Sequence, residues 1–160
     1  MFRNAVALLT AGLVICPSMA SPQSQTEQEV AEFIMDVYRY NNTQLKTRPE
    51  DYSQHGALEF WSSGGLLQEI ASGGAAEEYD AFNVQPKHIR VITLVEGQAA
   101  VAHYYAEGSL KPKGYPAVTN YLARVTMVCT KEAGAWKTRS AHYSALLGGA
   151  GTSQTAQVTP

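Results

Sequence analysis

The stretch that decides the fold runs from Ile89 to Ser144 and reads IRVITLVEGQAAVAHYYAEGSLKPKGYPAVTNYLARVTMVCTKEAGAWKTRSAHYS. Runs rich in β-branched and aromatic residues alternate here with turn signals, which is typical of strands joined by hairpins. Glu96-Gly97 and Ala133-Gly134 are tight turns, whereas residues 108–119, rich in Lys, Pro and Gly, predict a long exposed loop. The predicted strands span residues 89–94, 99–107, 121–131 and 136–144. They form an antiparallel meander.

The strand at 121–131 shows the clearest alternation. One of its faces is apolar throughout and holds Tyr121, Ala123, Val125, Met127 and Cys129. The opposite face is mixed. Because successive strand residues point to opposite sides of a sheet, we expect the apolar face to be buried.

Helical signals precede the meander. Apolar residues recur at helical spacing after a capping box at Thr26 and Glu29, which predicts a helix over residues 27–41. The residues between helix and meander predict a helical turn at 49–54, a strand at 57–62 and a short helix at 75–82. Residues 66–70 fit a return strand or one helical turn, and the strand is preferred. Helices followed by a meander indicate an α+β fold, with helices packed on one face of a curved antiparallel sheet. Such a sheet leaves a concave mouth suited to a small-molecule pocket.

The N-terminal 20 residues are typical of a signal peptide. Arg3 precedes a short apolar run that ends at Cys16, and Ser18-Met19-Ala20 provides small residues at a cleavage site. A buried N-terminal helix and a lipoprotein anchor fit less well, because the run lacks a polar face and Ile15 is large for the residue before a lipidated Cys. We expect cleavage after Ala20 and export, to a bacterial periplasm or as a secreted protein. The mature chain would hold one domain over residues 21–146, a disordered tail over 147–160, and no membrane span.

Composition excludes several function classes. The 160-residue chain has a formal net charge of −2 and 16% charged residues, without the Lys/Arg clusters that nucleic-acid binding requires. No two of the four His lie at metal-ligand spacing beside a carboxylate, so we expect no metal site and no cofactor. Cys129 would be the one Cys left after cleavage, and a lone Cys in an apolar strand is usually a small buried hydrophobe.

Several motifs resemble the nuclear transport factor 2-like superfamily. The hairpin VEGQAAVA at 95–102 is similar to its Gly-acidic-x-Ala-x-Val hairpin, and KEAGAWK at 131–137 with His142-x-Ser144 is similar to its closing hairpin. FWSSGG at 60–65 stands where the association domains of calmodulin-dependent kinase II and their bacterial relatives have a first hairpin. The resemblance covers residues 27–144. It implies a cone-shaped α+β barrel that forms a dimer or higher oligomer.

The resemblance does not imply one function, since the superfamily includes isomerases, cyclases such as the SnoaL-like ones, dehydratases, assembly domains and binding proteins. Its enzymes use an Asp or an Asp/His pair in the pocket. The chain has Asp36, Asp51 and Asp80, and none lies on a meander strand. This departure weighs against acid–base catalysis. Asp36 could face the pocket, although an Asp on an amphipathic helix is more often solvated.

Arg124 is the first candidate for a binding residue. It lies in mid-strand among apolar residues and matches an Arg that kinase association domains point into their pocket. A buried guanidinium requires a partner. In one interpretation Arg124 holds a carboxylate- or phosphate-bearing ligand bidentately. In the other it bridges to Asp36, Glu59 or Asp80.

The other candidates are His and aromatic residues. His142 and His103 could orient a ligand or act as a general base, since imidazole titrates near neutrality. Equally, each could be a hydrogen-bonded sheet residue or an interface residue. Tyr38, Trp61 and Tyr104 could line a pocket or belong to the core.

Three functional hypotheses follow. The first is a non-catalytic exported domain that binds a small organic ligand, acidic ones included, in a pocket centred on Arg124, and that forms a homodimer. The second is an isomerase- or cyclase-like enzyme that uses His142 or His103 with Tyr104 or Tyr38. The third is an oligomerisation module without a ligand.

Overall fold

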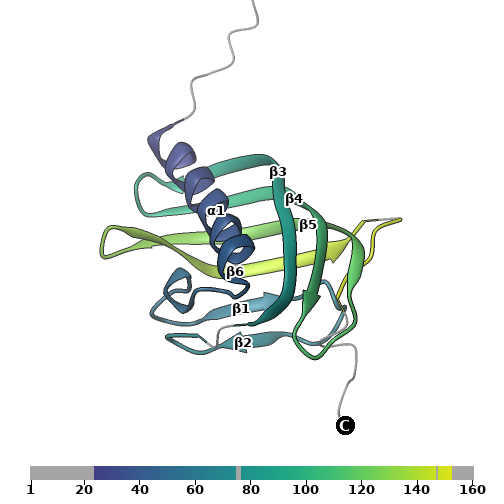
Figure 1. The fold of residues 1–160 in the computed structure, drawn as a ribbon. Coiled ribbons are helices and arrows are strands. Elements are labelled where there is room, and N and C mark those ends of the chain that lie inside the picture. The colour runs from purple at the N-terminus through teal and green to yellow at the C-terminus, as the bar shows by residue number, and fades with distance from the viewer. Residues whose placement is uncertain (1–23, 75–76, 147, 153–160) are drawn as a thin grey trace, which may run out of the picture.

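A computed structural model describes residues 24–74, 77–146 and 148–152 of the chain. Its elements are α1 (Gln25–Gln44), the 3₁₀ turn η1 (Pro49–Asp51), β1 (Ala57–Phe60), β2 (Gln68–Ile70), β3 (Tyr79–Val95), β4 (Ala99–Pro112), β5 (Val118–Glu132) and β6 (Ala135–Ala145). The strands form one sheet in the order β2-β1-β6-β5-β4-β3. The sheet curls around α1, which lies across its concave face (Figure 1).

The predicted α+β cone is confirmed, with two differences. A single α-helix, rather than several helices, covers the sheet in the described residues. The sheet is also mixed, because β1 runs parallel to β6 while the other neighbouring strands are antiparallel. The strand predicted at 66–70 and the helical turn predicted at 49–54 are present in shorter form as β2 and η1.

Irregular backbone positions bend the long strands. In β3, His88 has a φ of 54° and lies within a shift of register against β4. In β4, Gly108 has a φ of 150°, and a Cβ there would lie 1.9 Å from the carbonyl oxygen of Asn83. Bulges and glycines of this kind increase strand curvature. They allow β3 and β4 to turn down around the end of α1 (Figure 1).

The core lies between α1 and the concave face of the sheet. Val30, Ile34 and Tyr38, spaced by four residues, are buried on one side of α1. They meet the inward residues of β4 and β5, and the face of β5 predicted to be apolar and buried is the one that faces them. Cys129 on that face is fully buried and free.

The start of α1 differs from the prediction. The capping box is formed by Ser24 and Glu27: the Ser24 hydroxyl accepts from the Glu27 amide at 3.2 Å, and the Glu27 carboxylate accepts from the Ser24 amide at 3.1 Å. Thr26 instead donates to Glu96 at 2.7 Å and accepts from the Gly97 amide at 2.8 Å. Both Ser24 and Thr26 begin a Ser/Thr-x-x-Glu pattern. Because the Thr26 hydroxyl is bound to Glu96 and Gly97, both in the β3–β4 turn, Ser24 rather than Thr26 caps the helix.

The helix predicted at 75–82 is wrong in its described part. Residues 75 and 76 lie outside the described residues, and β3 begins at Tyr79. The start of β3 pairs with Lys111 and Pro112, so β4 extends into the predicted loop and leaves 113–117 as the connection. Local helix propensity is weak compared with such strand pairing, which provides hydrogen-bond partners for the backbone amides and carbonyls of both segments.

Two predicted terminal segments lie wholly or partly outside the described residues. The predicted signal peptide lies outside the described residues, as do Leu147 and residues 153–160 of the predicted tail. Residues 148–152 lie against β5, where the Ala150 amide donates to Asn120 at 2.9 Å. Within the described residues, no helix combines the length and apolar character needed to cross a membrane.

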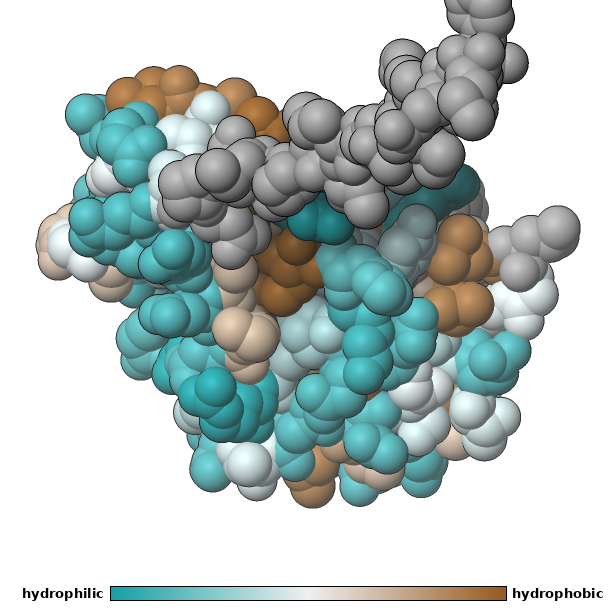
Figure 2. All heavy atoms as spheres, turned by 90° about the horizontal axis from the view of Figure 1, so that it is seen from above, coloured by the Kyte–Doolittle hydropathy of each residue, from teal (hydrophilic) through white to brown (hydrophobic). Residues whose placement is uncertain are grey.

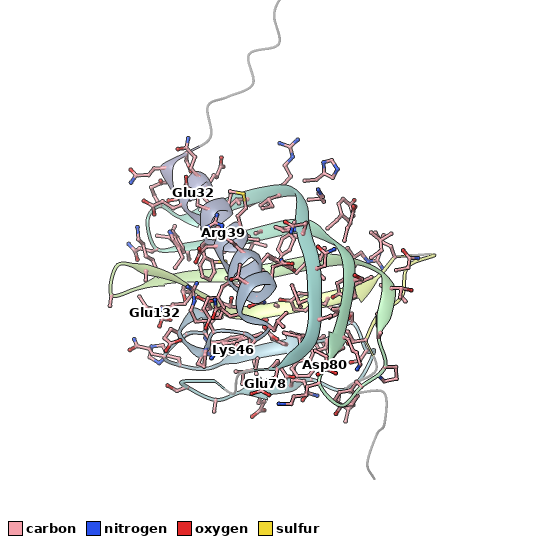
Figure 3. The ribbon with its side chains drawn as sticks, in the orientation of Figure 1. Glu32, Arg39, Lys46, Glu78, Asp80 and Glu132 are labelled. Carbon is pink, nitrogen blue, oxygen red and sulfur yellow. The ribbon has the colours of Figure 1, made fainter. Side chains whose placement is uncertain are left out.

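Most charged side chains of the described residues lie at the rim and on the outer surface, and Asp51 and Glu59 are buried exceptions. Seen from above, hydrophilic residues cover most of the described surface and hydrophobic ones form separate patches (Figure 2). Lys46, Glu78 and Asp80 gather at the edge where β3 starts (Figure 3). Glu78 is paired with Lys113, and Asp80 with Lys111 at 2.7 Å. The acids of this rim are therefore neutralised by Lys111 at the end of β4 and Lys113 in the β4–β5 connection.

Candidate functional site

A cavity of about 120 Å³ lies between the C-terminal half of α1 and the concave face of the sheet. Its walls come from α1, from the segment around η1, and from strands β1, β3, β4, β5 and β6. Seven aromatic side chains line it: Tyr38, Tyr52, Trp61, Tyr79, Phe82, Tyr121 and Tyr143. Burial raises the pKa of Tyr52 and Tyr143 well above the usual value, so both phenols are neutral and able to donate hydrogen bonds.

Glu59 on β1 is the most deeply buried acid of the cavity. The alternation of β1 points Ala57 and Glu59 inward and Leu58 and Phe60 outward, and Glu59 is 3% exposed. Trp61 Nε1 donates to Glu59 Oε2 at 2.8 Å. Burial raises the pKa of Glu59 to about 7, and the carboxylate of Glu77 acts in the same direction. Glu59 can therefore gain or lose a proton near neutrality.

Asp51 in η1 is the second cavity acid. Its Oδ1 accepts from Arg48 Nε at 2.8 Å, whereas its Oδ2 is buried and has no hydrogen-bond partner. Arg48 also bridges to Asp36 on α1 at 2.7 Å, and its guanidinium lies over the Tyr40 ring, 4.8 Å from the centroid. Burial raises the pKa of Asp51, although the hydrogen bond from Arg48 opposes this.

Glu77 is the third cavity acid. Its backbone is fixed by Thr47, whose hydroxyl accepts from the Glu77 amide at 2.8 Å and whose amide donates to the Glu77 carbonyl at 2.9 Å. Burial raises the pKa of its half-buried carboxylate. No Lys or Arg in the described ranges forms an ion pair with Glu59 or Glu77. The cavity is therefore acidic.

Arg48 and Asp51 also border a second, outer hollow. This groove, of about 590 Å³, lies between the first half of α1 and the β5–β6 hairpin. Trp136 and Lys131 close part of it, and both donate to Glu29, at 2.9 and 2.6 Å. These contacts lower the pKa of Glu29 to about 2, with Lys131 as the largest cause. The Arg48–Asp51 pair is thus a shared wall between groove and cavity.

The structure separates the predicted site residues into two groups. Tyr38 and Trp61 line the cavity. Tyr104 is buried behind Tyr38, its ring edge-on at a centroid distance of 5.9 Å. Arg124, His103 and His142 are exposed instead, on the outer face of the sheet.

The cavity is consequently not centred on Arg124, which corrects the prediction. Odd-numbered residues of β5 face α1, so Arg124 faces outward, where its Nε donates to Ser144 at 2.7 Å. It forms no bridge to Asp36, Glu59 or Asp80, the three partners that the sequence suggested. Mid-strand position among apolar neighbours did not indicate burial here, because the neighbours Ala123 and Val125 point to the opposite, buried face.

The two histidines share the outer face and one cross-strand row. His103 pairs with Thr126, and Thr126 with His142. His103 Nδ1 lies 3.1 Å from the Thr126 hydroxyl, and His142 contacts the Phe60 ring at a centroid distance of 5.5 Å. Neither imidazole reaches the cavity, so the pairing of either His with Tyr38 or Tyr104 in one site is not present.

Sequence reasoning missed Glu59 as a cavity acid and considered it only as a bridge to Arg124. The available signal was the alternation in Ala-Leu-Glu-Phe at 57–60, which places Glu59 on the face of Ala57. As for metals, no group of three or more His, Cys, Asp or Glu side chains among the described residues could hold an ion.

Comparisons with known proteins show which solved structures share this fold. The sequence matches no protein-family model and no curated protein at a significant level. A solved structure from Novosphingobium aromaticivorans, provisionally named an aromatic ring hydroxylase, is similar over 82% of this chain and 96% of its own, with 15% identity and a TM-score of 0.58.

Two further solved structures are similar. An NTF2-like protein of unknown function from Pseudomonas putida matches over 76% of this chain and 87% of its own, with 14% identity and a TM-score of 0.54. The CaMKII hub homology domain of Chlamydomonas reinhardtii matches over 77% of this chain and 99% of its own, with 17% identity and a TM-score of 0.52. One helix held in the concave face of a six-stranded mixed sheet, together with these similarities, shows that the chain has the fold of the nuclear transport factor 2-like superfamily.

Proposed function

We propose that the protein binds a small organic molecule in the cavity, with Glu59 as its polar anchor. The observation that carries this is the combination of an aromatic-walled hollow with a carboxylate that is 3% exposed and bound by Trp61 alone among the described side chains. A buried carboxylate without a cationic partner destabilises the folded protein. Such groups are typical of functional sites. Ligand pockets typically combine apolar walls with a few such polar groups.

The size of the cavity limits the ligand to about one ring. An apolar cavity of about 150 Å³ in another protein binds benzene, and this one measures about 120 Å³. The anchor is Glu59 in place of Arg124, and three acids surround the cavity. An anionic ligand, which the sequence suggested, is therefore not favoured.

Ligand-observed NMR with a library of single-ring compounds tests the proposal. We expect some members to bind the wild-type protein and to lose affinity in Glu59→Gln. Glu69→Gln is the matched control, since Glu69 is exposed on β2, next to β1 in the sheet. Absence of binding by every member, or equal binding by both variants, would contradict the proposal.

The second candidate function is enzymatic proton transfer, which the pKa of Glu59 near 7 favours. A general base works best when its pKa lies near the working pH. In this candidate Glu59 replaces His142 and His103 as the proton acceptor, and the neutral phenols of Tyr52 and Tyr143 stabilise developing negative charge. Wash-out of deuterium from deuterated cyclopentanone tests it. Glu59→Gln should slow the exchange by about 100-fold or more if the enzyme hypothesis holds, and Glu69→Gln should not.

Self-association through the outer sheet face accompanies either function in our proposal. Leu58 and Ile92 are 42% and 54% exposed and belong to one cross-strand row with Val101 and Val128. A second copy of this chain would cover such a row, and the hub domain among the similar structures supports this. Ile92→Glu should convert a dimer to a monomer in light scattering, whereas Leu66→Glu, in the β1–β2 connection, should not.

We also retain export as part of the proposal, because residues 1–20 have the pattern of a signal peptide. The mature N-terminus, determined by mass spectrometry on protein from a secreting bacterial host, tests cleavage after Ala20.

A further inference from the structure

The charge of the cavity determines which ligands it can accept. Asp51, Glu59 and Glu77 all line it, and Arg48 is the one cation among the described lining residues. Arg48 is already bound to Asp36 and Asp51, at 2.7 and 2.8 Å. The acids of the rim differ, since Glu78 and Asp80 each have a lysine partner. Glu59 and Glu77 are therefore interior carboxylates that no Lys or Arg of the described chain pairs with, whereas Asp51 is paired with Arg48.

Asp51 provides an independent indication of a missing hydrogen-bond donor. Its side chain is 10% exposed, and its Oδ1 is taken by Arg48. Its Oδ2 is buried and accepts no hydrogen bond, and Asp51 is one of the residues that line the cavity. A buried acceptor left unpaired is unfavourable by about 1–3 kcal/mol. A ligand with N–H groups directed at Oδ2 would satisfy it.

The aromatic walls favour the same kind of ligand. The π faces of Trp and Tyr attract cations, and aromatic cages of this type bind organic ammonium groups. Trp61, Tyr52 and Tyr79 line the cavity beside the three acids. A carboxylate or phosphate ligand would instead meet the like charges of Glu59 and Glu77, which have no cationic partner among the described residues. A neutral ligand would leave the acids without compensation.

We propose that the cavity is selective for an organic amine of about one-ring size, whose ammonium group lies among Glu59, Asp51 and Glu77 while its ring contacts the aromatic walls. This inference rests on the proposed function and names the ligand class of the same site. The ammonium donates to Asp51 Oδ2 and to the Glu59 oxygen that Trp61 does not occupy. Glu77 adds charge at the cavity wall.

Titration calorimetry with three compounds of similar shape tests the selectivity. Benzylamine, benzyl alcohol and phenylacetate place a cation, a hydroxyl and an anion on the same ring. At pH 8 we expect benzylamine to bind about thirtyfold or more tightly than benzyl alcohol, as a desolvated charge pair would provide. Phenylacetate should not bind measurably.

Variants separate charge recognition from packing. Glu59→Gln and Asp51→Asn each keep the shape of the side chain, and each should reduce the preference of benzylamine over benzyl alcohol by about tenfold or more. Glu69→Gln should preserve it. Circular dichroism establishes that each variant is folded, and having two independent acid variants keeps the test informative if one fails to fold.

The outcomes distinguish the two levels of the proposal. Equal or tighter binding of benzyl alcohol or phenylacetate would overturn the amine inference and leave the ligand-binding function standing. Absence of binding by all three compounds and by toluene, an uncharged ring of the same size, would overturn both.

Discussion

The indole of Trp61 donates to the carboxylate of Glu59 at 2.8 Å, and both side chains face the cavity. This is the one hydrogen bond that Glu59 receives from the described side chains, and the donor is neutral. The carboxylate is thus fixed in place without being neutralised. A buried acid in this state is available both to a cationic ligand and to a proton.

The stability of the protein should fall as pH rises through neutrality because of Glu59. Burial raises its pKa from the ordinary 4.5 to about 7. A group with a raised pKa contributes stability that is fully present below its unfolded pKa and is lost as pH rises through its folded pKa. Between pH 4.5 and pH 7 the loss amounts to about 3 kcal/mol.

Urea unfolding at pH 5 and pH 8 measures this loss. The difference in unfolding free energy between the two pH values should be smaller in Glu59→Gln than in wild type by about 3 kcal/mol. Asp51 and Glu77, whose pKa values are also raised, act in the same direction and remain in both proteins. An identical pH dependence in the two proteins would show that Glu59 is not buried as a carboxylate in solution.

The affinity for benzylamine should rise with pH until Glu59 is ionised. Binding of the cation requires the carboxylate, so a proton is released below the pKa of about 7. Affinity should then increase by up to about tenfold per pH unit below pH 7 and level off above it. Trp61 donates a hydrogen bond to Glu59, and the titratable groups that interact with Glu59 electrostatically are Glu77, Tyr52, Tyr79, Tyr104 and Tyr143.

Isothermal titration at pH 5.5, 6.5, 7.5 and 8.5 gives the profile. The amine remains protonated throughout most of this range, so the change reports the protein. A flat profile, or one that falls with pH, would be inconsistent with ammonium recognition by Glu59.

The sequence was sufficient to predict the faces of β5, since strict alternation over a long strand identifies Ala123, Val125 and Met127 as one inward row. It could not show which side of a bent sheet is concave at the position of Arg124. That depends on bends at His88 and Gly108, in other strands. The assignment of Arg124 to the pocket relied on the resemblance to kinase association domains and on neighbours in sequence, which on a strand belong to the opposite face.

The acids of the cavity were harder to find. β1 is four residues long, so its alternation carries little statistical weight. The burial of Glu59 arises from segments far along the chain, among them Glu77 and Tyr143. Asp51 is buried because η1 packs against β6, where the Ser53 amide donates to Thr138 at 3.0 Å. Contacts of this kind leave no local pattern.

Gly108 should be among the least replaceable residues of the sheet. A Cβ at this position would lie 1.9 Å from the Asn83 carbonyl oxygen, which belongs to the backbone of β3 and cannot move freely. Gly108→Ala should destabilise the protein by roughly 3 kcal/mol or more, at the upper end of single substitutions. Thermal unfolding measures the effect.

Gly114→Ala is the matched control for Gly108→Ala. Gly114 has a φ of 80° and open space around its Cα, so the substitution adds backbone strain without a clash. We expect Gly114→Ala to lower the free energy of unfolding by about 1 kcal/mol. Similar losses in both variants would contradict the close approach of β3 and β4 at Gly108.

Ile34 should account for much of the packing between α1 and the sheet. It is fully buried, and Ile34→Ala should destabilise the protein by about 2–5 kcal/mol through lost burial and the resulting cavity. The next residue, Met35, is 43% exposed, so Met35→Ala should change the free energy of unfolding by about 0.5 kcal/mol or less. Equal losses of unfolding free energy in the two variants would contradict the orientation of α1 in which Ile34 faces the sheet and Met35 faces solvent.

Arg48 and Arg39 both bind Asp36 but differ in what their removal leaves behind. The side chain of Arg39 is 67% exposed and pairs with Asp36 alone, so Arg39→Met should lower the free energy of unfolding by about 0.5 kcal/mol or less. The side chain of Arg48 is 29% exposed and also holds Asp51, whose side chain is 10% exposed. Arg48→Met would leave Asp51 buried without a cation and should cost about 1–3 kcal/mol, reduced from the full effect of a broken buried pair by the partial exposure of Arg48.

Adding Asp51→Asn to Arg48→Met should restore part of the lost stability, because the double variant no longer contains the uncompensated charge. A double-mutant cycle by urea unfolding at pH 7 measures this recovery. Additive losses would mean that Asp51 is neutral in the folded protein at that pH. In that case the acid charge of the cavity would reside on Glu59 and Glu77, and Asp51→Asn would leave benzylamine affinity unchanged.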